Sequence, residues 1–190
     1  MSRRPAVAVG IAIVAFIVGW LMFVGAPRWF SRPPKPVAAA PAPAPPAPAG
    51  RKIKARLFYV SEDGTRLASV ERDIAYGEGA VEQAREIVAA QIAPVVEPLV
   101  SAVSPGTTLR AVFLTQSGEA YVDLSRELMT AHPGGTLNEL LTIYTIVNAL
   151  TVNLPAVTSV QVLVDGKEVE TLAGHIDLRQ PLPKNLSWIQ

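Results

Sequence analysis

The chain has 190 residues, with 17 Lys and Arg, 16 Asp and Glu, two His and no Cys. All 16 acidic residues lie at or after Glu62, so residues 1–50 carry a net charge of +5 and residues 51–190 a net charge of −4. An acidic domain lacks the basic surface that nucleic-acid binding needs, and a chain without cysteine has no disulfide scaffold, thiolate metal site or Cys nucleophile.

The first predicted element is a transmembrane helix over residues 6–26, an uncharged apolar segment that follows a short basic N-terminus, residues 1–5. About 20 apolar residues at 1.5 Å per residue cross a hydrocarbon core of roughly 30 Å. A cleaved signal peptide is the competing interpretation, but its apolar region usually has only about 7–15 residues. Pro27 also follows the small residues that could form a cleavage site. We therefore expect an uncleaved membrane anchor.

Residues 27–50 form a Pro/Ala-rich linker, since 8 of the 17 prolines fall within residues 33–48. Proline has a fixed φ and no N–H, and Ala-Pro repeats offer no apolar face to bury. We expect an extended spacer on the order of 50 Å long, at about 3.1 Å per residue. Binding by a proline-recognition module is the alternative interpretation of the same residues.

Residues 51–190 predict a single α+β domain that contains three β-hairpins, each with a glycine in its turn. Alternation of apolar and polar residues marks the arms of these hairpins as strands. The expected strand pairs are residues 52–60 with 67–75, 108–114 with 120–124, and 159–164 with 167–172.

Two helices are expected between the hairpins, packed on a sheet. The first covers residues 80–92 and ends before Pro94; its predicted apolar stripe consists of Val81, Ala84, Val88 and Ile92. The second begins with a capping-box pattern, Thr136 at the cap and Glu139 three residues later, and continues to Leu150.

The surface of the second helix is apolar except for a narrow polar stripe, which predicts a mostly buried helix. The stripe consists of Asn138, Thr142, Thr145 and Asn148. Because a buried amide must find hydrogen-bond partners, we expect Asn148 to fix how this helix meets the sheet.

Several stretches of the domain resemble the sporulation and spore-germination (GerMN) domain family. Residues 120–125 read AYVDLS, residues 142–150 read TIYTIVNAL and residues 157–166 read VTSVQVLVDG, against a family pattern of IVNTLT…GV..V.ILVDG for the last two. Residues 104–109 and 174–178 are similar to the family's entry and tail motifs, whereas Ala149 and residues 94–96 depart from its pattern. The family-motif residues, which we expect to be structural, are Tyr121, Asp123, Leu124, Ser125, Asn148, Leu150, Asp165 and Gly166.

The resemblance implies an extracytoplasmic GerMN-like domain over residues 51–190, tethered to a membrane and without known catalysis. Some relatives look like the ring-building domains of secretion assemblies, whose small α+β units associate side by side. Basic residues flank both ends of the apolar segment, so charge alone does not orient it. The resemblance favours a single-pass protein of the cell membrane with an extracytoplasmic C-terminal domain.

No catalytic, cofactor-binding or metal-ligating residues are predicted. Asp123, Ser125, His132 and His175 could in principle form a Ser/His/Asp triad, but no G-x-S-x-G turn surrounds a serine. We expect Ser125 to cap the turn after its strand, His132 to be an exposed loop residue, and His175 to donate to a backbone carbonyl.

Two weaker features are also expected to be structural. Carboxylates near the hairpin turns could flank a glycan, although solvated charge is the usual role of such residues; they are Glu62, Asp63, Glu119, Glu168 and Glu170. Gly134 and Gly135 precede the second helix, where free N–H groups could bind an anion.

These observations favour a non-enzymatic, membrane-anchored envelope protein whose domain mediates protein–protein interaction or assembly. Its expected partners are the membrane, through the N-terminal helix, and envelope proteins or further copies of itself. The alternative is a cell-wall glycan-binding or glycan-processing domain, with peptidoglycan as its partner. Aromatic residues make up only 6% of the chain, so platforms for stacking sugars are scarce.

Overall fold

The computed structural model describes residues 15–23 and 50–190. Residues 15–23 are helical, and among the described helices none has both the length and the apolar character needed to cross a membrane. The rest of the predicted anchor, the basic N-terminus over residues 1–5 and linker residues 27–49 lie outside the described residues. Pro48–Gln190 forms a compact unit of its own, which contains the predicted α+β domain.

The domain begins with a two-stranded antiparallel sheet, β1 (Lys52–Val60) and β2 (Leu67–Ala75), at the positions that the sequence predicts. Its turn is held by Asp63, whose carboxylate accepts hydrogen bonds from the Ser61 hydroxyl at 2.6 Å and the Thr65 hydroxyl at 2.8 Å. These bonds lower the pKa of Asp63 to about 2. Gly64 has a φ of 71°, a conformation that glycine adopts without strain.

The second sheet has five strands in the order β3–β4–β5–β6, with β7 also paired to β5. Their bounds are β3 (Leu109–Leu114), β4 (Glu119–Leu124), β5 (Ser159–Val164), β6 (Lys167–Glu168) and β7 (Leu182–Pro183). The strands β4 and β5 are parallel, which hairpins alone would not produce, because a long helix connects them. The sequence predicted one sheet, whereas the structure has two.

The predicted return strand over residues 167–172 is wrong beyond Glu168, where β6 ends. Leu172 is buried and its N–H donates to the Glu139 carboxylate at 2.8 Å. The chain therefore leaves the sheet edge to make this contact, and residues 169–181 form loops instead of a strand.

Three helices belong to the domain: α2 (Ala80–Ile92), α3 (Glu127–Thr130) and α4 (Thr136–Asn153). The bounds of α2 agree with the prediction, whereas the short α3 was not predicted. The apolar stripe predicted for α2 is wrong at Val81, which is exposed, while Gln83 and Gln91 are buried because their amides bond to backbone groups.

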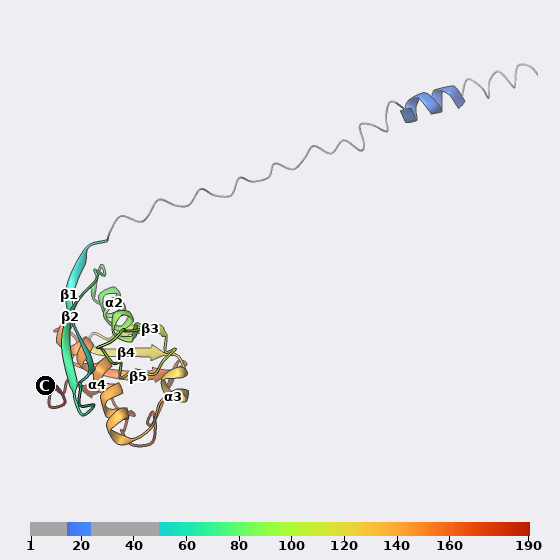
Figure 1. Ribbon diagram of the computed structural model, residues 1–190. Coiled ribbons are helices and arrows are strands. Elements are labelled where there is room, and N and C mark those ends of the chain that lie inside the picture. The colour runs from blue at the N-terminus through green and yellow to red at the C-terminus, as the bar shows by residue number, and fades with distance from the viewer. Residues whose placement is uncertain (1–14, 24–49) are drawn as a thin grey trace, which may run out of the picture. The chain divides into compact units, whose positions relative to one another are not determined.

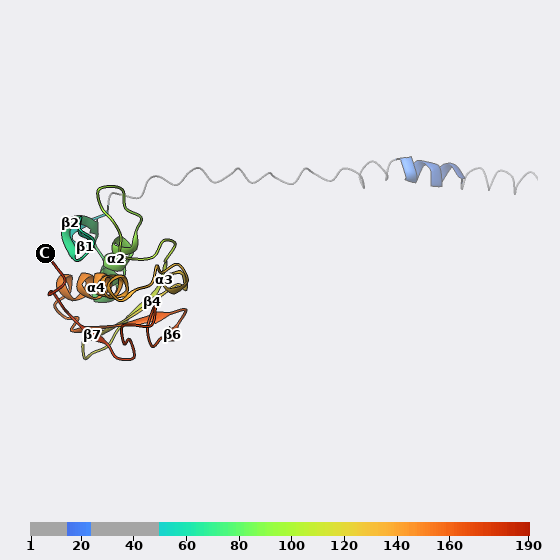
Figure 2. The ribbon, with the colours of Figure 1, turned by 60° about the horizontal axis from the view of Figure 1, so that its bottom comes forward.

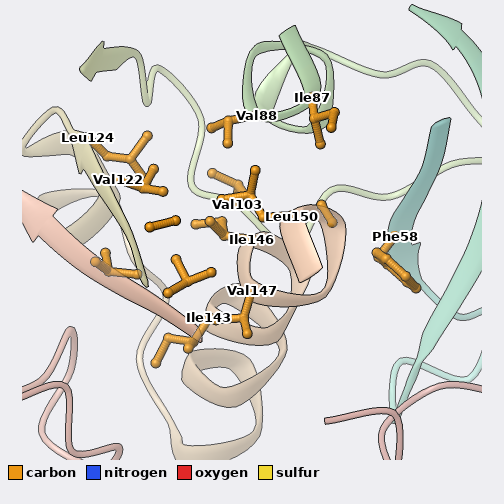
Figure 3. Close-up of a cluster of buried hydrophobic side chains, with 14 of the residues drawn as sticks. Phe58, Ile87, Val88, Val103, Val122, Leu124, Ile143, Ile146, Val147 and Leu150 are labelled. Carbon is orange, nitrogen blue, oxygen red and sulfur yellow. The ribbon is translucent and has the colours of Figure 1, made fainter. Parts of the chain in front are cut away.

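The helix α4 lies between the β1–β2 hairpin and the five-stranded sheet, as Figures 1 and 2 show. Phe58 of β1 stands on one side of α4, and Val122 of β4 stands on the other (Figure 3). Ile146 and Leu150 of α4 are almost fully buried between them. The fold is mixed α+β, as predicted, but a three-layer arrangement replaces the two layers expected, since α4 has an apolar surface on both sides.

Side-chain amides join the layers by pairing with backbone groups as a neighbouring strand would. Gln91 of α2 accepts from the Phe58 N–H at 2.8 Å and donates to its C=O at 2.7 Å. Asn153 of α4 makes the same two bonds with Arg56, at 2.8 and 2.7 Å. The outer edge of β1 is thereby bonded to the helices at Arg56 and Phe58.

Candidate functional site

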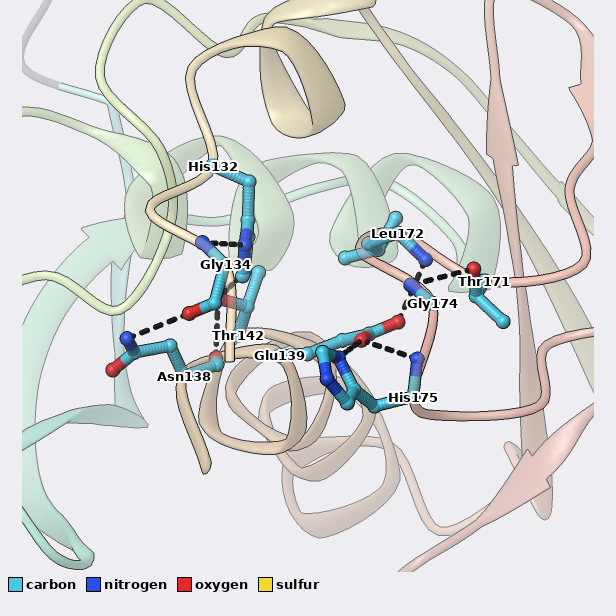
Figure 4. A network of polar contacts seen from close by, with 9 residues as sticks. All are labelled: His132, Gly134, Asn138, Glu139, Thr142, Thr171, Leu172, Gly174 and His175. Atoms are coloured by element: carbon cyan, nitrogen blue, oxygen red, sulfur yellow. Dashed lines mark hydrogen bonds and ion pairs between the residues drawn. The ribbon is translucent and has the colours of Figure 1, made fainter. Parts of the chain in front are cut away.

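Glu139 is the most unusual ionisable group of the domain, since its side chain is fully buried. One carboxylate oxygen accepts from the Leu172 N–H at 2.8 Å. The other accepts from the His175 N–H at 2.9 Å and lies 3.1 Å from Nδ1 of the His175 ring. Figure 4 shows the loop over residues 171–176, hereafter the Glu139 loop, wrapped around this carboxylate.

The surroundings of Glu139 keep it ionised. Burial by itself would raise the pKa of a carboxyl group, but the backbone N–H groups of Ala173, Leu172, His175 and Ile176 stabilise the anion more strongly, and the net effect is a lowered pKa. Successive N–H groups converging on one anion form a nest. Here the anion is the Glu139 carboxylate of the same chain. The nest is therefore occupied, and it holds the Glu139 loop against α4.

The predicted capping box is therefore wrong. The residue before α4 is Gly135, no side chain caps the helix, and Thr136 is exposed. Glu139 cannot reach back to the cap because its oxygens are taken by the Glu139 loop. The prediction that His175 donates to a backbone carbonyl is also wrong, since its ring contacts the Glu139 carboxylate.

His132 is half-buried, where an exposed loop residue was predicted. Its Nδ1 accepts from the Gly134 N–H at 2.9 Å, and its Nε2 lies 3.2 Å from the Thr142 hydroxyl (Figure 4). Thr142 in turn donates to a backbone carbonyl, either that of Ala102 at 2.6 Å or that of Asn138 at 2.8 Å. The Gly134 N–H is thus used internally and is not free to bind an anion.

Burial lowers the pKa of His132, because an imidazolium ion loses solvation, and this outweighs the opposite effect of the Glu139 charge. A neutral ring with an accepting Nδ1 carries its proton on Nε2 and points it at Thr142. His132 therefore fixes the turn before α4.

Asp123, a family-motif residue, ties three segments of the domain together from its place in β4. One carboxylate oxygen accepts from the Gly166 N–H at 2.7 Å, and the other accepts from Nε of Arg110 at 3.0 Å. Arg110 also lies 3.6 Å from the Asp165 carboxylate. Asp165 and Gly166 both have positive φ angles, 50° and 76°, as the tight β5–β6 turn requires. The motif pair Asp123 and Asp165–Gly166 is thus one structural unit around a buried carboxylate.

The remaining members of the hypothetical triad do not meet. Ser125 Oγ accepts from the Thr108 N–H at 3.0 Å and joins the start of β3 to the end of β4, so the predicted cap is wrong. The hydroxyl of Ser125 also lowers the pKa of the Glu127 carboxyl. Asp123, His132 and His175 each have their own separate partners, and no hydrogen bond among the described residues joins any two of the four.

Asn148 finds hydrogen-bond partners, as expected of a buried amide, but they belong to the C-terminal segment and not to the sheet that the sequence predicted. Its Nδ2 donates to the Asn185 C=O at 2.8 Å and its Oδ1 accepts from the Asn185 N–H at 3.1 Å. The C-terminal segment is thereby fixed to α4, a contact between residues 37 positions apart in the chain. In the same polar stripe, the hydroxyl of Thr145 is buried and has no hydrogen-bond partner among the described residues.

The last family-motif residues belong to the core and the sheet. Leu124 and Leu150 are fully buried. Tyr121 is partly buried in β4, where its neighbours across the sheet are Phe113 and Gln161. Leu124 and Leu150 thus belong to the core, and Tyr121 has a place in the central part of the sheet.

The clefts of the described domain that are open to solvent include the following three. One of about 250 Å³ lies between β2 and α2; one of about 410 Å³ is lined by residues 92–106; and one of about 410 Å³ lies beside Pro155 and Lys184. None of the three is lined by an aromatic side chain. Within the described residues no cluster of three or more His, Asp or Glu could hold a metal ion.

The carboxylates near the turns do not assemble around these clefts. Glu62, Glu168 and Glu170 are exposed, and Asp63 is engaged by its own turn. The acidic residues that do line a cleft are Asp73 and Glu86, in the one between β2 and α2. The sequence had not pointed to them because they lie on different elements, whose packing no local pattern reveals.

Solved structures of other proteins share this fold. It is similar to that of a candidate lipoprotein from Clostridium perfringens, 21% identical over 70% of this chain and 88% of that one, with a TM-score of 0.50. It is also similar to the tandem GerMN domains of the sporulation protein GerM from Bacillus subtilis, 14% identical over 70% of this chain and 46% of that one, with a TM-score of 0.54. No curated protein sequence gives a significant match.

These likenesses establish a mixed α+β domain of the GerMN kind. The family model named Germane, described as sporulation and spore germination, matches residues 56–170, which is more than half of the chain. The chain belongs to this family, and the resemblance drawn from its sequence motifs is confirmed.

Proposed function

We propose that this protein is a non-catalytic, membrane-anchored envelope protein whose domain works by contact with other proteins or with further copies of itself. One observation carries the proposal: three buried or half-buried ionisable side chains are bonded to the domain's own backbone. The carboxylates of Glu139 and Asp123 and the ring of His132 all bond to main-chain N–H groups. Groups used in this way hold loops in place and leave no nucleophile beside a free base.

The proposed anchor rests on residues 6–26, whose 21 uncharged, apolar residues match the length of a membrane-spanning helix. Family membership supports an extracytoplasmic domain on a tether. The Pro/Ala-rich residues 27–50 would then hold the domain away from the lipid surface, where it can meet partners. Anchoring raises the local concentration of such domains, so that weak contacts suffice for assembly.

The glycan alternative has less support from the clefts described above. A carbohydrate site needs a concave surface with convergent polar groups and aromatic side chains. The three clefts of the domain have no aromatic lining. A peptidoglycan pull-down is the direct test: retention of the chain by purified sacculi, competed by soluble muropeptides, would favour the alternative.

The mass of the full chain in detergent tests the proposed self-association. Multi-angle light scattering over a hundredfold range of concentration should show a species heavier than the 20.2 kDa chain plus its detergent, growing with concentration. A constant monomer mass would remove self-association and restrict the proposal to contacts with other proteins. Hydrolysis of any cell-wall substrate by the purified chain would overturn it entirely.

A further inference from the structure

The outer edge of β2 leaves main-chain groups unpaired. The outer groups of β1 belong to Arg56, Phe58 and Val60, because these residues bond to Asn153, Gln91 and Val100. In an antiparallel pair, bonded and outward-facing residues alternate. The unbroken register Arg56↔Glu71 and Phe58↔Ser69 therefore turns the N–H and C=O groups of Ser69, Glu71 and Asp73 away from β1. These three residues are hereafter called the β2 edge. All three are exposed, and Ser69 is the one nearest the β1–β2 turn.

The outer edge of β1 is bonded from Arg56 to Val60, to side-chain amides of α2 and α4 and to Val100. At the start of β2, Leu67 is bonded to Trp188 at 2.7 Å and to Gln190 at 3.0 Å. At the far end the Ala75 C=O accepts from Gln83 at 3.4 Å. No hydrogen bond among the described residues reaches the main-chain groups of Ser69, Glu71 or Asp73.

The charged residues beside the β2 edge indicate which kind of strand would fit there. On the face that the β2 edge shares with β1, Lys54 pairs with Asp73 at 3.3 Å and Arg56 lies opposite Glu71. A row of positive charges is thus followed by a row of negative charges. Opposite charges on neighbouring strands attract and like charges repel. The next strand in this ladder should carry positive charges.

A second copy of β2 does not meet this requirement. Symmetric antiparallel pairing of two such edges in the central register would place Glu71 opposite Glu71 and Ser69 opposite Asp73. Like charges directly opposite each other destabilise a strand pair. The outer edge of β1 does carry Lys54 and Arg56, but the main-chain groups of Arg56 and Phe58 are already bonded to the helices in each copy, so the β2 edge of a second copy could not pair along it. The fitting partner is therefore a strand of another protein.

The cleft between β2 and α2 supplies a pocket on the opposite face of the same edge. Its lining includes the apolar residues Leu57, Ile74, Ala75, Ala90, Ala93 and Pro94 together with Arg72, Asp73 and Glu86. An added strand directs alternate side chains to opposite faces. Its residues beside Glu71 and Asp73 would share the charged face, whereas the residue between them would face this cleft.

We propose that the β2 edge is a strand-addition site, which binds an extended segment of another protein through main-chain hydrogen bonds. The segment has Lys or Arg at alternate positions facing Glu71 and Asp73, and a small or medium apolar residue facing the cleft between β2 and α2. In this mode backbone pairing provides affinity and alternate side-chain positions provide specificity. This proposal rests on the proposed function as a protein of contacts and names the chemistry of one partner.

The test uses the full chain in detergent and, as probe, a capped heptapeptide of alternating Lys and Val. Binding is followed by fluorescence anisotropy of a labelled peptide, and amide hydrogen exchange is followed residue by residue. Saturable binding should slow exchange at Ser69, Glu71 and Asp73, whose N–H groups then enter a ladder. The same peptide N-methylated on one edge, which retains all charges, should bind at least tenfold more weakly.

Charge variants complete the test. Glu71→Lys combined with Asp73→Lys should weaken binding about tenfold, since two attractive cross-strand pairs become repulsive. Glu168→Lys with Glu170→Lys changes the net charge equally at residues outside the hairpin and should leave binding within about twofold. No saturable binding at millimolar peptide, equal binding of the N-methylated peptide, or equal loss in both charge variants would each overturn the proposal. The light-scattering test of self-association does not depend on peptide binding. The proposed self-association and the proposed strand-addition site can therefore fail independently of each other.

Discussion

Replacing Glu139 by Gln tests whether the buried carboxylate holds the Glu139 loop. The substitution keeps the shape of the side chain but removes the charge and turns one acceptor oxygen into an amide donor. Three groups lie within 3.1 Å of the carboxylate oxygens, namely the N–H groups of Leu172 and His175 and the His175 ring. A hydrogen bond to a charged group contributes about 1.5–3 kcal/mol and a neutral one about 0.5–1.5 kcal/mol, while a buried donor left unpaired costs about 1–3 kcal/mol.

Weakening these bonds and leaving one donor unpaired together predict that Glu139→Gln lowers the free energy of unfolding by about 3 kcal/mol. Domains of ordinary stability have about 5–15 kcal/mol in total, so the variant should still fold. The assay is urea denaturation followed by circular dichroism, with amide exchange at Leu172 and His175 as a local readout. Glu168→Gln makes the same chemical change at an exposed position and should stay within about 0.5 kcal/mol of the wild type.

The pH dependence of the same variant adds a second check. The pKa of Glu139 is lowered in the folded protein, so its contribution to stability is complete above the pKa of an unfolded Glu, about 4.3. That contribution is lost as the pH falls through the lower, folded pKa. The stability difference between wild type and Glu139→Gln should therefore shrink below about pH 4.3. A Gln variant as stable as wild type at pH 7, with unchanged exchange at Leu172, would refute the reasoning.

Two other buried contacts and the membrane topology can be tested in the same way, by single substitutions. Asp123→Asn should lower the free energy of unfolding by about 1–3 kcal/mol and speed amide exchange at Gly166, because the single acceptor oxygen of Asn cannot bond to both Gly166 and Arg110. Unchanged exchange at Gly166 would contradict the role of Asp123. Asn148→Ala should lower the free energy of unfolding by about 2–4 kcal/mol and release the C-terminal segment, which faster amide exchange at Asn185 would show. An Asn185 amide that still exchanges slowly would show that other contacts hold the segment. Glu62→Cys introduces the chain's sole thiol at an exposed turn; a membrane-impermeant maleimide should label it in intact cells, and labelling only after permeabilisation would contradict the extracytoplasmic topology.

The sequence predicted those parts of the fold that depend on neighbouring residues. The β1–β2 hairpin follows from alternation and an Asp-Gly turn, and its strands begin and end at the predicted residues. The bounds of α2 follow likewise from its periodicity and Pro94. The burial of α4 was predicted from its narrow polar stripe, and 11 of its 18 residues are buried. Local patterns suffice where the partners of a residue lie in the same element.

Long-range partners explain what the sequence did not predict. Thr136 and Glu139 have capping-box spacing, yet Glu139 bonds to residues 33 and 36 positions later, which no local pattern reveals. The end of β6 depends on the same contact. The motif residues Asp123 and Gly166 were recognised as a family signature, but that they bond to each other depends on the parallel pairing of β4 and β5.

Photo-crosslinking in intact cells tests most directly the central claim that this domain acts by binding other proteins. A photoreactive amino acid is placed at single exposed positions around the domain, including Glu71, Phe113 and Val96. Discrete protein adducts should form at positions that share one surface and be missing at the others. If no position gave a protein adduct, or if the chain were captured only on peptidoglycan, the domain would not be a module for protein contacts.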